Sequence, residues 1–383
     1  MTTDSSRDID VVRQELAQAP AMVRALVPAI WASVQELLER VDATAVSRVV
    51  LTGCGDSLFA GLAARLAFER YARLPTEAVD ALEFARYGAD MLPAGALVAP
   101  ISYSGQVART VEAAYNARRF GATVVALTGR PERRLARTAH DVLPVQVPSL
   151  GFSMGASTYI GLLLGAYLLA LGLGQRRGAI DTAHVEALLA RLRDVSGVAE
   201  RALADGERAL PDAAAWLAER ERVLFLGAGP NYASALFGAA KLYEGAQLDG
   251  AAQSIEEWAH AQYFISGPDS RTVLLASAGR SLERAYEIAR EMRYIETPFL
   301  VITDDEPARW RELTPRVLAL PAGVSEVFSP LLYALPLSQL GYYLAKARGK
   351  SSYNFPSPER EREHYQTLHE SPFYDFPPTE AAW

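Results

Sequence analysis

The sequence predicts an α/β fold that consists of two similar domains in tandem, each a parallel sheet with helices on both faces. The first observation is that apolar, β-rich runs alternate with amphipathic helical segments along most of the chain. The second is a repeat, in which VVLTGCGDSLFAGLAARLAFE (49–69) parallels VLFLGAGPNYASALFGAAKLYE (223–244). Three glycine pairs match across this repeat: Gly53 with Gly227, Gly55 with Gly229, and Gly105 with Gly279.

Each half has the same order of predicted elements: strand, glycine turn, helix, strand, turn, helix, strand, then a short strand and a long helix. We therefore place the first domain at 46–175 and the second at 221–346. Residues 1–45 and the connection at 176–220 have helical patterns. Residues 347–383 are rich in proline, tyrosine and charge, and we expect an irregular tail that wraps the surface or a partner subunit.

The composition narrows the classes of function. At 383 residues the chain is long enough for two domains, and half of its residues are apolar. The formal net charge of −7 argues against a nucleic-acid partner or an anionic membrane surface. A single cysteine, Cys54, excludes an internal disulfide, and the acidic N-terminus lacks an apolar signal core. These features predict a soluble, cytoplasmic protein.

One segment has the composition of a membrane helix. STYIGLLLGAYLLALGLG (157–174) is uncharged and about as long as a short transmembrane span. It occurs singly, is interrupted by glycine and begins with three polar residues. We therefore predict that it is a helix buried inside the protein or its dimer, and that the protein has no membrane partner.

Two glycine- and hydroxyl-rich turns are candidates for an anion site. GCGDS (53–57) and SYSGQ (102–106) each follow a predicted strand and precede a predicted helix, where ligands bind in such sheets. A helix start offers free N–H groups, the hydroxyls add donors, and a glycine lets a phosphate approach the backbone. The alternative is that Ser102 and Ser104 only cap a helix. The candidate phosphate-binding residues are Cys54, Gly55, Asp56, Ser57, Ser102, Tyr103, Ser104, Gly105 and Gln106.

Nucleotide and metal motifs are not found. The third glycine of a G-x-G-x-x-G fingerprint falls on Leu58, and no G-K-[ST] occurs. Four of the five histidines lie in polar or tail regions without a metal-ligand spacing: His140, His184, His364 and His369. We therefore predict neither a cofactor nor a metal.

Four segments of the chain together resemble the sugar isomerase (SIS) family, above all the isomerase half of glucosamine-6-phosphate synthases. These segments are GCGDS, SYSGQ, GASTY (155–159) and LGAGPNYASALFGAAKLYEGAQLDGAAQSIEEWAHAQ. The resemblance covers roughly residues 46–346. It implies tandem SIS domains with a flavodoxin-like, three-layer fold, and it adds Ser157 to the phosphate-binding residues. In that family a Lys-x-x-Glu helix is followed sixteen residues after the glutamate by a histidine, and Lys241, Glu244 and His260 keep this spacing.

The chain also departs from the family pattern. The threonine that precedes Ser57 in the family is Asp56 here, and the threonine of the phosphate loop is Val107, with Thr110 one turn later as a substitute. Nothing in the chain resembles the synthase's glutaminase domain. The C-terminal signature with its Schiff-base lysine has no match, and Lys350 lies nearby without aligning to it. These departures argue against glutamine-driven amination.

The lysine content singles out one residue. The chain has three lysines, Lys241, Lys346 and Lys350, and Lys241 lies in the otherwise apolar segment GAAKLYEGA. Lys241 and Glu244 are three residues apart and share a helix face. The alternative is a surface ion pair that contributes a few tenths of a kcal/mol.

The chemistry of aldose–ketose interconversion assigns a role to each candidate. It requires a carboxylate that moves a proton between C1 and C2, which suits Glu244. It also requires a group that exchanges protons with oxygen near neutral pH, which suits His260. Lys241 would stabilise charge that develops on oxygen. Glu257 either orients His260 or is an exposed helix carboxylate.

Three functions remain open at this stage. The first is an enzyme that isomerises or deaminates a sugar 6-phosphate, with an amino-hexose as the expected substrate. The second is a plain aldose–ketose isomerase of phosphosugars. The third is a non-catalytic sugar-phosphate-binding regulator, although residues 1–45 are not basic as a DNA-binding segment would be.

A homodimer is the expected assembly. GLLLGAYLLALGLG and SPLLYALPLSQLGYYLA have too few polar residues for a solvated helix face. The family resemblance implies that His260 of one chain serves the Lys241–Glu244 site of its partner. The alternative is that SIEEWAH folds back on its own domain.

Overall fold

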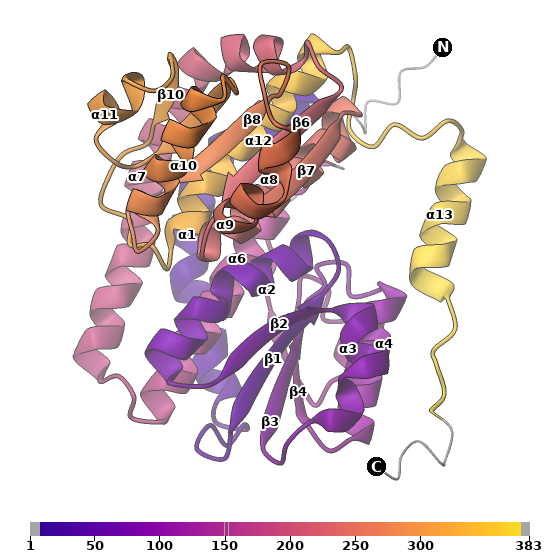
Figure 1. The fold of residues 1–383 in the computed structure, drawn as a ribbon. Helices are drawn as coiled ribbons and strands as arrows, with labels where there is room; N and C mark the ends of the chain where they lie inside the picture. The colour runs from indigo at the N-terminus through magenta and orange to yellow at the C-terminus, as the bar shows by residue number, and fades with distance from the viewer. Residues whose placement is uncertain (1–7, 149, 152, 377–383) are drawn as a thin grey trace. The chain divides into compact units, whose positions relative to one another are not determined.

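The structure is a computed structural model that describes residues 8–148, 150–151 and 153–376 (Figure 1). It contains two five-stranded parallel sheets, which confirms the predicted α/β fold with two domains in tandem. The chain divides into two compact units, and each is described here by itself. The described residues of the first-sheet unit are 25–147, 158–190 and 355–376, and those of the second-sheet unit lie within 8–24, 148–157 and 191–354.

The first sheet has the strand order β2-β1-β3-β4-β5. Its strands are β1 (Arg48–Gly53), β2 (Thr76–Asp80), β3 (Ala96–Pro100), β4 (Thr123–Thr128) and β5 (Asp141–Pro144). Its helices are α2 (Asp56–Ala67), α3 (Ala81–Tyr87), α4 (Ala108–Arg119) and α5 (Arg134–Thr138). Val50 and Val98 share a buried cluster with Phe84 of α3, whereas α2 packs on the opposite face, where Gly61 approaches Leu51. Helices therefore cover both faces.

The second sheet repeats this arrangement, with the order β7-β6-β8-β9-β10. Its strands are β6 (Arg222–Gly227), β7 (Asp249–Ser254), β8 (Thr272–Ala276), β9 (Phe299–Thr303) and β10 (Arg316–Ala319). Its helices are α8 (Pro230–Lys241), α9 (Ile255–His260), α10 (Leu282–Tyr294) and α11 (Pro307–Arg311). Leu226 and Leu274 pack against Trp258 and Ile288 on one face, and Phe225 approaches Gly238 of α8 on the other.

The equivalent strands β2 and β7 were not predicted from the sequence. Each lies beside the first strand of its half, and β7 is an edge strand whose residues are mostly half-buried. The sequences TEAVD and DGAAQS lack the apolar β-branched runs of the inner strands, because an edge strand is packed on fewer sides. Each strand follows a π-helical turn, η2 (Phe68–Ala72) in the first half and η4 (Leu242–Ala246) in the second. The repeat therefore extends further than the sequence indicated.

Five further α-helices and two short 3₁₀ helices complete the described chain: α1 (Asp10–Leu37), α6 (Ala156–Arg176), α7 (Thr182–Leu217), α12 (Ser329–Ala347), α13 (Pro358–Glu370), η3 (Ala89–Met91) and η5 (Gln262–Ile265). α6 is long and apolar enough to span a membrane, but 94% of its most apolar window is buried inside the structure. Its glycines explain this close packing: a Cβ on Gly161 would lie 2.5 Å from Val147 Cγ1, and one on Gly165 would lie 2.7 Å from Val145 Cγ2. The segment is therefore a core helix, as predicted.

The sequence predicted an irregular tail, but the structure places a helix in it, α13. Ser357 caps this helix by accepting a hydrogen bond from Arg360 N (3.3 Å), and Pro358 occupies its first turn. Arg362 pairs with Glu359 one turn away. Capping and charge pairing of this kind can form a helix whose residues are largely exposed, which an apolar periodicity cannot reveal.

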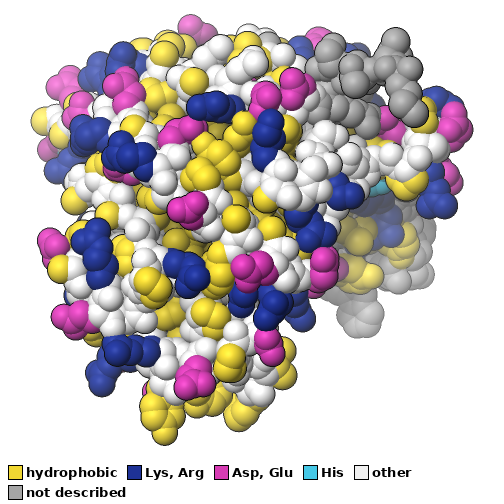
Figure 2. All heavy atoms as spheres, turned by 90° about the horizontal axis from the view of Figure 1, so that it is seen from above, with side chains coloured by type: hydrophobic (Ala, Val, Ile, Leu, Met, Phe, Trp, Pro, Cys, Tyr) yellow, Lys and Arg dark blue, Asp and Glu magenta, His cyan; other side chains and the backbone are white. Residues whose placement is uncertain are grey.

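The surface carries both signs of charge. On the face shown in Figure 2, acidic and basic side chains are interspersed, and apolar side chains lie between them. Several of the charges are paired, as in Arg284 with Glu256 and Arg309 with Glu283. Mixed charge of this kind differs from the basic stripe with which proteins track a phosphate backbone.

Candidate active site

The turn after β1 depends on two glycines. A Cβ on Gly53 would lie 2.9 Å from the carbonyl oxygen of Ile101, so glycine allows this turn to meet the chain that follows β3. Gly55 precedes α2 with φ 54° and ψ −131°, and Gly229 precedes α8 with φ 54° and ψ −134°. Residues that have a Cβ rarely adopt this backbone conformation. The two halves therefore begin with the same turn, as the matched glycines predicted.

The other residues of this turn face different surroundings. Cys54 lies 3.9 Å from the Thr110 hydroxyl, and burial raises the pKa of its thiol. Asp56 begins α2, and burial, together with the negative charge of Asp56, raises the pKa of Tyr159 on α6 far above its usual value. Ser57 is half-buried in the first turn of α2, and its backbone N–H donates to the Cys54 carbonyl.

The 102–106 loop is folded tightly between β3 and α4. Ser102 is buried, and its carbonyl accepts from Gly105 N (3.1 Å). Gly105 has φ 63°, and a Cβ there would lie 3.1 Å from the Thr128 hydroxyl, so glycine is required. Tyr103 reaches the backbone of Val147 at 3.4 Å through its hydroxyl. Ser104 is exposed at the tip of the loop and accepts from the N–H of Gln106.

The capping alternative for this loop is wrong. α4 begins at Ala108 with Val107 as its N-cap, and no side chain caps the helix. The Ser104 hydroxyl therefore bonds within the loop, ahead of the helix. Thr110, which we considered as a substitute for the family's phosphate threonine, is fully buried with its hydroxyl toward Cys54. This environment favours a packing role for Thr110.

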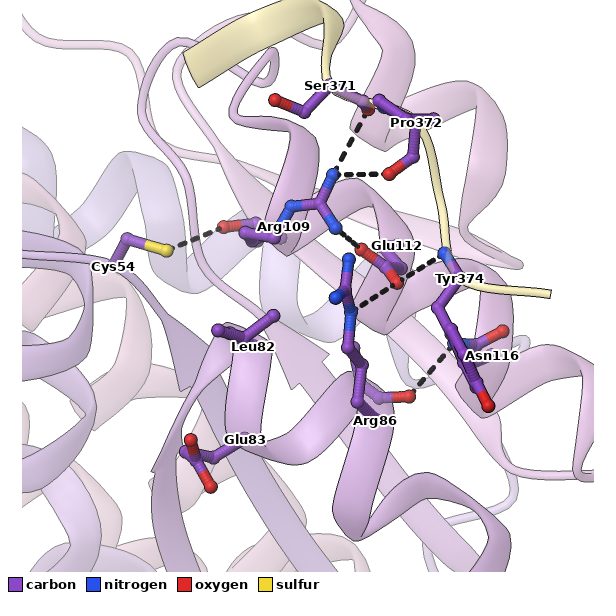
Figure 3. Close-up of polar contacts among 12 residues, drawn as sticks. Cys54, Leu82, Glu83, Arg86, Arg109, Glu112, Asn116, Ser371, Pro372 and Tyr374 are labelled. Carbon is purple, nitrogen blue, oxygen red and sulfur yellow. Dashed lines mark hydrogen bonds and ion pairs between the residues drawn. The ribbon is translucent and has the colours of Figure 1, made fainter. Parts of the chain in front are cut away.

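The sequence interpretation missed a charged cluster in the first two turns of α4. Glu112 is completely buried and pairs with Arg109 and with Arg86, whose Nε is 3.1 Å away (Figure 3). The Arg109 guanidinium also donates to the backbone carbonyls of Ser371 and Pro372, at 3.1 and 2.7 Å. The only signal in the sequence was the i, i+3 spacing of Arg109 and Glu112, which is common on solvated helices.

The equivalent loop of the second half (277–281) is already occupied by a carboxylate. Glu326 Oε1 accepts a hydrogen bond of 3.0 Å from the Arg280 N–H, and a Cβ on Gly279 would lie 2.4 Å from the same oxygen. Next to it, Ala278 N donates to Asp304 Oδ1 (2.8 Å), and burial raises the pKa of Asp304. Backbone donors that would face a phosphate in this half are therefore bound to the protein's own acids.

Lys241 and Glu244 form an interior ion pair. Lys241 is fully buried at the end of α8, and its Nζ lies 2.6 Å from Glu244 Oε2 in η4. The same ammonium donates to the carbonyl of Met154 and lies 4.5 Å from the centre of the Phe237 ring, where the ring face attracts a cation. The alternative of a surface ion pair is therefore wrong.

Two other segments of the second-sheet unit reach this pair. Tyr353 N, just after Lys350, donates to the Glu244 carbonyl at 2.7 Å, so the chain that leaves α12 returns to η4. On α1, Glu15 is buried and accepts a hydrogen bond of 2.5 Å from Ser153, the neighbour of Met154. Glu15 was missed, although a glutamate at apolar helix spacing between Val12 and Leu16 was a usable signal.

The remaining candidates are His260, Glu257 and Ser157. His260 ends α9 with its side chain 71% exposed, and its Nε2 is 3.4 Å from Glu256 Oε1. Glu257, which we considered as the residue that orients His260, is exposed, and Glu256 takes the neighbouring position instead. Ser157 is buried in the first turn of α6.

A comparison with known protein families identifies the first half of the chain. Residues 44–171 match the model of the SIS domain. These residues are an SIS domain. The matched range contains all of the predicted phosphate-binding residues, and Lys241, Glu244 and His260 lie beyond it.

Relatives and solved structures extend the likeness over both halves. The chain is 29% identical over 308 residues to a glutamine–fructose-6-phosphate aminotransferase (isomerizing) of Gloeobacter violaceus, which covers 79% of this chain and 50% of the relative. It spans about half the length of the curated relatives that it matches.

Among solved structures, the fold is similar to the C-terminal domain of glucosamine-fructose-6-phosphate aminotransferase from Francisella tularensis. The TM-score is 0.82 at 19% identity, with 90% of this chain and 98% of the other covered. Glucosamine-6-phosphate deaminase from Thermotoga maritima gives a TM-score of 0.66 at 18% identity, with 89% and 96% covered. The SIS family match and the likeness to the sequence relatives confirm the resemblance that we drew from the SIS motifs, and the solved structures confirm the fold.

Proposed function

We propose that the protein is an enzyme that isomerises or deaminates a sugar 6-phosphate, with an amino-hexose 6-phosphate as its expected substrate. The observation that carries the proposal is the interior Lys241–Glu244 pair. Removing an ammonium group from water costs several kcal/mol, and an ion pair repays this only partly. An apolar side chain would fill the same place without that cost, so retention of the charge favours a chemical role.

The proposed roles follow from the chemistry of the pair. Glu244, whose side chain is 23% exposed, would remove the proton from C2 of the opened sugar and return it to C1. Lys241 would stabilise the negative charge that develops on oxygen in between. His260, exposed and near a carboxylate, would exchange protons with the ring oxygen during opening. If C2 carries an amine, the same transfer gives an imine, which water hydrolyses to a ketose and ammonium.

The 102–106 loop of the SIS domain is proposed to bind the phosphate. Ser104 offers an exposed hydroxyl at the tip of this loop. Substrate names of the relatives support this choice, since the Gloeobacter violaceus protein is named for fructose 6-phosphate and the Thermotoga maritima protein for glucosamine 6-phosphate.

The test is NMR spectroscopy of a panel of hexose and amino-hexose 6-phosphates incubated with the enzyme in D₂O. We expect deuterium to enter C1 of one of these sugars, and release of ammonium identifies a deaminase rather than an isomerase. Glu244→Gln keeps the shape but removes the base, and should lower turnover by about 10²–10⁴. If the protein binds a sugar phosphate but no deuterium enters the sugar, the result would contradict the proposed enzymatic activity and indicate a sugar-phosphate-binding regulator.

A further inference from the structure

Glu15 is a buried carboxylate that the proposed mechanism does not use. It lies on α1, is only 6% exposed, and is flanked by the buried residues Val12 and Leu16. A carboxylate in such a place is costly unless its oxygens are hydrogen-bonded or paired with a positive charge. The hydrogen-bond and charge partners of Glu15 therefore indicate the role of its carboxylate.

The first partner of Glu15 is the turn at Ser153. The Ser153 hydroxyl donates to Glu15 Oε2 at 2.5 Å, and the Ser153 Oγ itself accepts from Gly155 N at 3.3 Å. A serine hydroxyl can donate one hydrogen bond and accept others, so the Ser153 Oγ serves both contacts at once. Met154 lies between these two contacts, and its carbonyl accepts from Lys241 Nζ. Glu15 is thus joined to the lysine through one short turn.

The Met154 side chain fixes this turn against the helices that carry the ion pair. A Cβ on Gly245 would lie 2.3 Å from Met154 Sδ, and one on Gly341 would lie 3.5 Å from its terminal methyl carbon and 2.8 Å from Lys241 Cβ. The thioether therefore packs between η4 and α12 without room to spare. A turn held in this way keeps the Met154 carbonyl at a fixed place.

Charge adds a second connection. Burial raises the pKa of the Glu15 carboxyl above its usual value, and the Ser153 hydrogen bond and the positive charge of Lys241 offset only part of this rise. Lys241 therefore faces two carboxylates, Glu244 by direct contact and Glu15 across the turn. Two negative charges favour the protonated form of a buried amine, which burial alone would disfavour.

We propose that Glu15 is a positioning residue that keeps Lys241 protonated and directed at Glu244, acting through the Ser153–Gly155 turn and through its own charge. Its effect on catalysis rests on the proposed function, but its effect on Lys241 does not. The state of Lys241 can be measured without any substrate, so the two proposals can fail separately.

The low lysine content makes this measurement direct. In a Lys346→Arg/Lys350→Arg variant, Lys241 is the remaining lysine of the chain. Protein labelled with ¹³Cε-lysine then gives a single side-chain signal, whose shift against pH reports the ionisation of Lys241. Glu15→Gln in this background removes the charge and keeps the shape. The matched control is Glu36→Gln, an exposed glutamate on the same helix.

We expect Glu15→Gln to move the Lys241 signal and to lower its titration midpoint by about one pH unit, with no change for Glu36→Gln. Ser153→Ala should move the signal with a smaller change of midpoint, because the charge of Glu15 remains. If activity is present, kcat should fall by about 10- to 100-fold with KM nearly unchanged, and Glu15→Asp should restore part of the loss. An unchanged Lys241 signal and midpoint in folded Glu15→Gln overturns the inference. A shifted midpoint in a protein without activity on any sugar phosphate overturns the proposed function alone.

Discussion

The backbone N–H of Tyr374 donates a hydrogen bond of 2.8 Å to Glu112 Oε1, so a fully buried carboxylate on α4 holds the C-terminal segment of the described chain. The ring of Phe373 lies beside Tyr115, and the ring of Phe376 lies beside Phe120. Segment 371–376 is therefore bound to the helix that follows the proposed phosphate loop, both by charge and by aromatic packing.

Replacing this carboxylate should destabilise the first-sheet unit. Glu112→Gln leaves Arg86 and Arg109 without their buried counter-charge, and we expect the free energy of unfolding to fall by about 3 kcal/mol in urea titrations. Chymotrypsin should then cleave faster at Phe373 and Tyr374, because the segment loses its anchor. Glu83→Gln, an exposed carboxylate on α3 that points away from this cluster in Figure 3, is the control and should change neither result.

The phosphate assignment predicts a specific kinetic pattern. Ser104→Ala removes an exposed hydroxyl of the 102–106 loop and should raise KM for the phosphorylated sugar by about tenfold or more, with little change in kcat. Ser281→Ala, in the equivalent region of the second half, should leave both constants unchanged. A collapse of kcat at constant KM in Ser104→Ala would argue that the serine takes part in the chemistry.

The occupied loop of the second half predicts one phosphate site per chain. Isothermal titration of the protein with sugar phosphate should give one bound equivalent, because Glu326 already accepts from the Arg280 N–H. Glu326→Ala frees this backbone donor and removes the carboxylate from the loop, and a second, weaker equivalent should appear. Glu291→Ala, an exposed glutamate on α10, should bind one equivalent like the parent. Two equivalents in the unmodified protein would contradict this account.

The proposed shared site predicts recovery of activity by subunit mixing. The exposed position of His260 suits a residue that serves a second copy of the chain. Glu244→Gln and His260→Ala should each be inactive. After subunit exchange, a mixed dimer with shared sites has one site with both changes and one with neither, so activity should partly return. No recovery, once exchange is demonstrated, means that each site is built within one chain.

The sequence predicted those elements that depend on neighbouring residues or on a periodic pattern of apolar residues. The inner strands of both sheets have apolar β-rich runs, and the turns at Gly55 and Gly229 require a conformation that glycine adopts most easily. The spacing of Lys241 and Glu244 indicated a shared helix face, and the structure places them in contact. Signals of this kind are visible in one segment of the chain.

The features that the sequence could not predict depend on partners far away in the chain. Glu326 reaches a loop about 46 residues earlier, and Glu112 binds a backbone N–H contributed by Tyr374. Neither glutamate differs in its sequence context from a solvated one. The strand β7 was missed for a related reason, since its ordered state comes from pairing with β6 rather than from its own apolar residues.

The complete burial of Lys241 has a consequence for how this protein can be observed. An amine-reactive reagent can reach Lys346, whose side chain is 50% exposed, directly from solvent. It can reach Lys241 only after α8 or its neighbours transiently open. When opening and closing are fast relative to labelling, the ratio of the two labelling rates measures the free energy of the opening that exposes Lys241 under native conditions. Lys241 therefore reports on local opening of the structure around the ion pair.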